Sequence, residues 1–113
     1  MSKKRKASRA STTPVVTIFE ASTGANGAVV RGQPITQDQA EARRKAGQDV
    51  VVCGPNLREN RRLAGQIERN ANGSARRCHP HELAGEYALP HFQPDSRPPT
   101  GHTFYETEHR KAF

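Results

Sequence analysis

A short, fully apolar strand followed at once by an amphipathic helix is the feature that most limits how this chain can fold. Residues 49–53 read DVVVC, so apolar side chains fall on both faces of the predicted strand, and Gly54-Pro55 closes it. A strand of this kind is stable only inside a sheet that is covered on both faces. The sequence therefore predicts a sheet with this strand in its interior and other elements packed against it.

The helix that follows is predicted from its end signals and its periodicity. Asn56 stands at the N-cap position, Glu59 stands three residues on, where it would complete a reciprocal cap, and Asn72-Gly73 ends the helix. Its apolar stripe consists of Leu63, Ala64, Ile67 and Ala71. The opposite face carries four arginines, Arg58, Arg61, Arg62 and Arg69. This face is typical of a solvated helix surface, with contact to phosphates as the alternative.

The N-terminal part predicts a second helix and a hairpin. Helix formers fill Gln37 to Ala46, after a capping-box signal at Thr36 and before Gly47. Upstream, the runs VVTIF at residues 15–19 and AVV at residues 28–30 flank the turn-rich ASTGANG. These two runs fit a hairpin, and a linker is the alternative.

Two further strands are predicted toward the C-terminal end. They are ALPHFQP, residues 88–94, and HTFYET, residues 102–107, joined by the loop DSRPPTG. Alternation divides the second strand between two faces, with His102, Phe104 and Glu106 on one and Thr103, Tyr105 and Thr107 on the other. Together these elements predict an α+β fold in which one or two N-terminal helices pack on a small antiparallel sheet.

Charge and composition divide the chain into three segments. Residues 1–13 form a basic leader that lacks large apolar side chains after Met1, so we expect it to be disordered. Residues 14–46 are expected to form a linker or hairpin plus a short helix, and residues 47–113 the functional domain. The net charge is +7, but five of the positive charges lie in the leader, which leaves the body at only +2. No apolar run reaches the roughly 18 residues of a membrane span, and no signal peptide follows the basic start. We therefore expect a soluble chain.

The histidines carry the strongest functional signal. All five lie between residues 79 and 109: His79, His81, His91, His102 and His109. Imidazole can both take and give a proton near neutral pH, which is what RNA cleavage by transesterification requires of its acid and its base. A third group must offset the charge that develops on the phosphorus oxygens. The residues around these histidines include candidates for every role.

Candidate site residues are assigned by these roles. His91 and His102 lie in adjacent predicted strands and are the expected acid and base. Thr103 and Tyr105 offer hydroxyl donors. Cations for the phosphate are expected from Arg97 in the loop or from Arg76 and Arg77, while Arg61 and Arg62 on the helix would steer the RNA backbone. Neither a metal nor a cofactor is expected in this mechanism.

Other readings of the same residues stay open. Cys78, His79 and His81 stand within four positions, and His91 or His102 could complete a zinc-like set, which would suit a metal-dependent DNase. A basic protein that binds nucleic acid without cleaving it would use the same arginines and aromatic rings. A small interaction module or immunity-like inhibitor is a further alternative. Cys53 ends an apolar strand and is expected to be buried and unreactive.

The segments NRRLAGQIERNANG and HPHELAGEYALPHFQPDSRPPTGHTFYE resemble the C-terminal toxin domains of bacterial polymorphic toxins, the variable tips of Rhs-type and contact-dependent effectors. The likeness covers roughly residues 47–110. The PHFQP and GHTFYE elements are similar to those of the small ribonuclease group that includes barnase, EndoU and RelE-like toxins. The resemblance is moderately specific, because these elements are more than a chance pair of histidines.

The resemblance implies an endoribonuclease toxin that acts without metal. It makes His91 and His102 the acid and base pair, Thr103 and Tyr105 the transition-state donors, and His81 a third candidate. It also implies two partners: RNA, whether tRNA, rRNA or mRNA, and a cognate immunity or antitoxin protein, expected to be acidic. The chain departs from a full effector in lacking long delivery repeats and in opening with Met1 and a basic leader. We therefore expect a freestanding toxin, a trimmed domain or an orphan cassette. The resemblance also implies a location in the cytoplasm of a bacterial cell, either the producing cell or a target reached through a secretion system.

Overall fold

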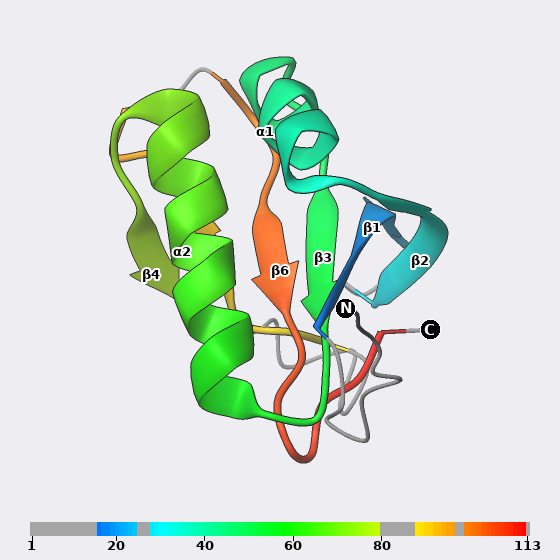
Figure 1. Ribbon diagram of the computed structural model, residues 1–113. Helices are drawn as coiled ribbons and strands as arrows, with labels where there is room; N and C mark the ends of the chain where they lie inside the picture. Colours follow the sequence, from blue (N-terminus) through cyan, green and yellow to red (C-terminus); the bar gives the residue numbers. More distant parts are fainter. Residues whose placement is uncertain (1–15, 25–27, 80–87, 97–98, 113) are drawn as a thin grey trace, which may run out of the picture.

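Two helices lie against one face of a mixed sheet (Figure 1). The computed structural model describes residues 16–24, 28–79, 88–96 and 99–112. In chain order the elements are β1 (Thr17–Thr23), β2 (Val29–Ile35), α1 (Gln37–Lys45), β3 (Val50–Cys53), α2 (Leu57–Asn72), β4 (Arg76–Cys78), β5 (His91–Gln93) and β6 (Thr103–Tyr105). The leader, residues 1–13, lies outside the described residues.

The six described strands follow the order β2-β1-β3-β6-β5-β4. Neighbouring strands are antiparallel except for β3 and β6, which run parallel with Val51 opposite Phe104. The predicted α+β class is confirmed, and the parallel pair makes the sheet mixed. This pair matters for function because parallel strands begin at the same end of a sheet, so the residues that precede β3 and β6 are brought together.

β3 occupies the interior position that its apolar run predicts. It lies between β1 and β6, and Val50, Val51 and Val52 have no solvent exposure. Their side chains alternate between the two faces of the sheet, so each face receives part of the apolar surface of the strand. One four-residue strand therefore contributes to both halves of the core.

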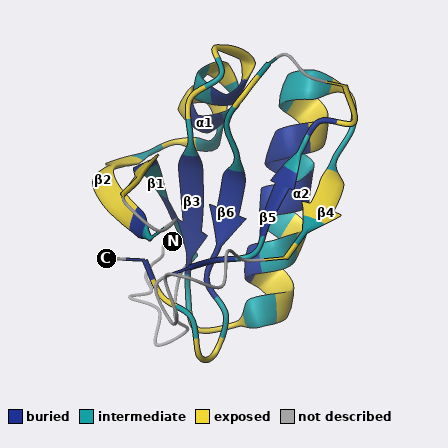
Figure 2. Cartoon of the chain, turned by 180° about the vertical axis from the view of Figure 1, so that it is seen from behind, coloured by how far each residue is buried: buried dark blue, intermediate teal, exposed yellow. Residues whose placement is uncertain are grey.

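The face under the helices holds the larger part of the core. α1 contributes Ala40, and α2 contributes Ala64 and Ile67 from its predicted apolar stripe. The strands supply Ile18, Val50, Val52, Phe92 and Tyr105. The opposite face, seen in Figure 2, packs a second cluster made of Ala21, Val29, Val51, Cys53, Leu89, Phe104 and Ala112.

The helix ends follow the cap signals, with one difference. At α1 both halves of the capping box form, since Gln39 N–H donates to Thr36 Oγ1 at 3.2 Å and Thr36 N–H donates to Gln39 Oε1 at 2.9 Å. At α2 the Asn56 side chain accepts from the Glu59 N–H at 3.0 Å. The Glu59 carboxylate pairs with Arg62 at 3.1 Å instead of reaching back to the cap, because both side chains lie on the exposed face.

The predicted hairpin is confirmed as β1 and β2, with a register shift between Phe19 and Ala21. It extends to Thr23 and Ile35, beyond the two β-branched runs that predict it. β4 was not expected from the sequence. It is only three residues long, and two of them are arginines, so neither periodicity nor β-propensity marks it.

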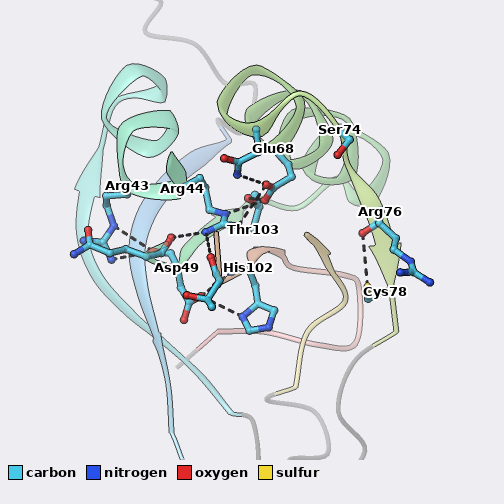
Figure 3. A network of polar contacts seen from close by, with 12 residues as sticks. Arg43, Arg44, Asp49, Glu68, Ser74, Arg76, Cys78, His102 and Thr103 are labelled. Carbon is cyan, nitrogen blue, oxygen red and sulfur yellow. Dashed lines mark hydrogen bonds and ion pairs between the residues drawn. The ribbon is translucent and has the colours of Figure 1, made fainter. Parts of the chain in front are cut away.

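A buried ion pair joins both helices to the sheet (Figure 3). Arg44 of α1 and Glu68 of α2 are both 0% exposed, and Arg44 Nε donates to Glu68 Oε1 at 2.8 Å. The same carboxylate accepts from the Thr103 hydroxyl of β6 at 2.9 Å and from the Asn72 side chain. These bonds offset the cost of removing two charges from water.

We expect Glu68→Gln to lower the free energy of unfolding by about 3–5 kcal/mol, because the charge of Arg44 would stay buried without its counter-ion. Urea denaturation followed by circular dichroism measures this change. Arg62→Gln is the matched control, since it removes an ion pair whose side chains are 60% and 48% exposed, and it should cost no more than about 1 kcal/mol. Equal losses in the two variants would contradict the assignment of Arg44–Glu68 as a central contact.

Candidate active site

Two histidines meet on the face of the sheet that the helices leave uncovered. His91 of β5 lies directly opposite Phe104 of β6, and His102 lies two residues before Phe104, so all three side chains share one face. The imidazole centroids of His91 and His102 are 4.7 Å apart, with ring planes at 78°. The Phe104 ring lies 5.3 Å from His91 and 5.0 Å from His102. The expected histidine pair is thus brought together.

Asp49 holds His102 at two points (Figure 3). Its Oδ1 accepts the backbone N–H of His102 at 2.8 Å and pairs with the ring Nδ1 at 3.1 Å. Asp49 immediately precedes β3 and His102 immediately precedes β6, so the parallel pairing of these strands places them side by side. The side chains are 15% and 22% exposed, respectively, which leaves the dyad partly open to solvent.

Each ring has a polar contact at Nδ1. His91 Nδ1 lies 3.3 Å from the Leu89 carbonyl oxygen, and this oxygen can only accept, so the ring nitrogen is the donor. The same reasoning applies to His102 Nδ1 opposite the Asp49 carboxylate. In the neutral form of each ring the lone pair is therefore on Nε2, the nitrogen suited to take up a proton.

Arg44 fixes the two segments that carry this dyad. Its Nη1 donates to the carbonyl oxygens of Gln48 and Thr100, at 3.0 Å each. Gly101 lies flat against the guanidinium with φ +91°, and a Cβ there would be 2.6 Å from Nη1. Glycine is required at this position both by the positive φ and by the close approach. The residues adjoining Asp49 and His102 are thereby tied to one buried cation.

Thr103 and Tyr105 do not join the histidines, which corrects their expected role as donors beside them. Both point to the helix-covered face, as the alternation along the strand requires. The Thr103 hydroxyl donates to Glu68, and the Tyr105 ring lies 5.6 Å from that of Phe92 in the core under α2. Their hydroxyls are separated from the histidine rings by the sheet itself.

The arginines divide between the two faces of the sheet. In the β4–β5 pair, Arg76 is opposite Gln93, Arg77 is opposite Phe92 and Cys78 is opposite His91. Arg76 and Cys78 consequently share the face of His91, whereas Arg77 shares the helix face with Phe92. Arg61 and Arg62 belong to α2, which covers that same helix face, so these three arginines are not beside the histidine pair. His81 and Arg97 lie outside the described residues.

The hypothesis of a metal site at Cys78, His79 and His81 gains no support from the part of the chain that the structure describes. Within residues 16–24, 28–79, 88–96 and 99–112, no group of three His, Cys, Asp or Glu side chains could hold a metal ion. The thiol of Cys78 donates to the Arg76 carbonyl oxygen at 3.7 Å. His81, which that reading also requires, falls outside these ranges.

Asp49 is the site residue that sequence reasoning missed. An aspartate just before an interior strand is a signal for it, but its partner is 53 positions away. Only the parallel pairing of β3 with β6 identifies that partner, and the sequence alone predicted an antiparallel sheet.

Cys53 lies buried at the end of β3, as expected. Burial, together with the nearby Glu106 carboxylate, raises the pKa of its thiol from 9.0 to about 12. Because the thiolate is the nucleophilic form, Cys53 is poorly suited to covalent catalysis.

Comparison of the chain with protein-family models, with curated proteins and with solved structures finds no match. Neither described helix is long and apolar enough to cross a membrane.

The raised pKa of Cys53 predicts a pH-dependent loss of stability. Between pH 9 and 12 the unfolded chain releases a thiol proton that the folded chain retains, so unfolding becomes easier as the pH rises through this range. Compared with Cys53→Ala, the wild type should lose at most about 1.4 kcal/mol per pH unit above pH 9. Urea titrations of both proteins below pH 9 and at about pH 10 to 11 measure the difference. A difference that stays constant with pH would disprove the buried, neutral thiol.

The hydrogen bonds also predict the tautomers of the two rings. At a pH where the imidazoles are neutral, long-range ¹H–¹⁵N spectra should show His91 and His102 protonated at Nδ1, with exposed His109 as the reference ring. Asp49→Ala should release His102 into a mixture of tautomers, whereas Asp49→Asn should not, since the amide oxygen still accepts. Protonation of His102 at Nε2 in the wild type would refute the assigned Asp49–His102 bond.

Proposed function

We propose that this chain is an endoribonuclease that cleaves RNA by transesterification without a metal ion, using Asp49, His102 and His91. The observation that carries the proposal is the distance of 4.7 Å between two imidazole rings, one of which is held by a carboxylate. Two proton-transfer groups on one face, beside a carboxylate that orients one of them, are what general acid–base cleavage of a phosphodiester needs.

In this proposal His102 is the base. Its Nδ1–H is held by Asp49, so Nε2 takes the proton of the ribose 2′-hydroxyl while the 2′-oxygen forms a bond to phosphorus. The Asp49 carboxylate offsets the positive charge that develops on the ring, as the carboxylate does in a catalytic triad. Its two bonds to His102 also limit the rotation of the ring, so little reorganisation is needed before proton transfer.

His91 is then the acid. As an imidazolium it donates the Nε2 proton to the departing 5′-oxygen as the P–O5′ bond breaks. The products are a 2′,3′-cyclic phosphate and a 5′-hydroxyl, with one proton gained by His102 and one lost by His91. Arg76 lies on the same face of the neighbouring edge strand, where its guanidinium would offset the charge on the non-bridging oxygens.

The biological setting proposed from the sequence is that of a bacterial toxin. RNA in the cytoplasm of the target or producing cell is the substrate, and an acidic immunity protein is the partner that covers the site. The net charge of +7, of which five positive charges lie in the leader, supports attraction to both partners. A non-catalytic RNA-binding protein would share this attraction, so the decisive test is one of cleavage.

Purified wild-type protein should cut a synthetic RNA strand in the presence of a chelator, and should not cut the same strand with a 2′-deoxyribose at the cleaved position. His102→Ala and His91→Ala should each lower the cleavage rate by at least about 10²-fold. His109→Ala is the matched control, because His109 is an exposed histidine of the same C-terminal region, and it should cleave like the wild type. Denaturing gels and detection of the cyclic phosphate provide the measurement.

Three outcomes would contradict the proposal. Equal cleavage by wild type and both histidine variants would remove the assigned groups from the reaction. Loss of cleavage in the chelator would indicate a metal-dependent nuclease. Tight RNA binding with no cleavage would favour the non-catalytic alternative.

A further inference from the structure

A second cluster of arginines lies on the helix-covered side of the sheet, away from the histidine pair. Arg58 and Arg61 are three residues apart in α2, so their side chains lie on one face of the helix. Both line a pocket of about 360 Å³ at the start of α2, together with Pro55, Asn56, Leu57 and Glu108. Arg77 of β4 projects to the same, helix-covered face of the sheet, where it is opposite Phe92.

Tyr105 lies between the segments that carry Arg77 and Arg61. Its ring lies 5.6 Å from that of Phe92, the cross-strand neighbour of Arg77, and Asn60, next to Arg61, donates to the Glu106 carbonyl oxygen at 3.0 Å. Burial raises the pKa of Tyr105, and the nearby Arg77 and Arg61 guanidiniums act in the opposite direction. Two positive charges thus face one neutral hydroxyl. Their mutual repulsion is relieved when an anion lies between them, and guanidinium groups bind phosphate through paired N–H donors.

We infer that Arg61, Arg77 and Arg58 form a binding site for backbone phosphates of RNA, separate from the cleavage site. The inference rests on the proposed function for its choice of polymer, while the anion site itself is argued from the three arginines. Glu108 is the acidic residue at the pocket, so the cations outnumber the acids there. Arginine contacts to phosphate carry affinity and position the strand without reading its sequence.

The position of β4 limits the form of RNA that can use both sites. β4 is the last strand in the sheet order, and its consecutive residues Arg76 and Arg77 project to opposite faces. A polymer that contacts Arg76 on the face of the histidines and Arg77 on the face of Tyr105 must pass over the edge of this strand. A single strand bends sharply enough to do so, whereas a stiff duplex does not. The substrate class is therefore single-stranded RNA.

Binding of a fluorescent 2′-O-methyl RNA 12-mer, which lacks the attacking hydroxyl, tests the site without cleavage. Fluorescence anisotropy at several salt concentrations gives the dissociation constant and its salt dependence. Arg61→Gln and Arg77→Gln should each weaken binding by about 5- to 10-fold and reduce the slope of log K against log salt by about 0.7. Arg31→Gln is the matched control, because Arg31 is an exposed arginine of β2, the strand at the opposite end of the sheet order from β4, and it should weaken binding by less than about 2-fold.

Three results would overturn the inference. The first is unchanged affinity and salt slope in both Arg61→Gln and Arg77→Gln. The second is binding of a duplex of equal length at least as tight as that of the single strand. The third is competition by polyglutamate as strong as that by RNA, which would assign the surface to an acidic protein. If the arginine variants lose binding but the wild type cuts no RNA, the phosphate site stands and the nuclease proposal fails.

Discussion

The buried pair of Arg44 and Glu68 is the contact on which the rest of the structure depends. Two charges without solvent exposure are costly unless nearly every donor and acceptor is used. Here the Glu68 carboxylate accepts hydrogen bonds from side chains of α1, α2 and β6. The Arg44 guanidinium also donates to the carbonyl oxygens of Gln48 and Thr100. An apolar pair could bury a similar volume, but it could not hold two polar loops at a fixed separation. The ion pair thus links the stability of the core to the geometry of the candidate site.

The parallel pairing of β3 and β6 brings the two residues of the Asp49–His102 dyad together. Asp49 and His102 precede the two strands at the same end of the sheet, and Val50 N–H donates to the His102 carbonyl oxygen at 3.1 Å. Arg44 ties the chain one residue before Asp49 and two residues before His102. The dyad is therefore held on rigid strand ends and clamped loops, which is the kind of support that acid–base catalysis requires of its groups.

Local signals in the sequence were enough to predict every described element except β4, but they did not identify the contacts between elements far apart in the chain. The caps at Thr36 and Asn56 and the apolar stripe of α2 depend on residues within a few positions of one another, and these predictions are confirmed. The histidine pair followed from two strands being neighbours. Asp49 and the burial of Arg44 were missed because both depend on contacts more than twenty positions away, and an arginine in a helix of low apolar content is ordinarily exposed.

The placement of Thr103 and Tyr105 shows how a correct local pattern can conflict with a functional assignment. The alternation along 102–107 already put them on the opposite face from His102, so a shared cleft would have required a bulge in β6. The register of β6 is regular with β3 through all three residues and with β5 through Thr103 and Phe104. Successive side chains of a β-strand project to opposite faces, so a strand that presents a histidine to one face must present the hydroxyl of the next residue to the other. The two faces of the sheet consequently carry different chemistry: proton-transfer groups lie on one face, and Tyr105 lies near arginines on the other. The edge strand β4 adds positive charge to both faces, because Arg76 projects to one and Arg77 to the other.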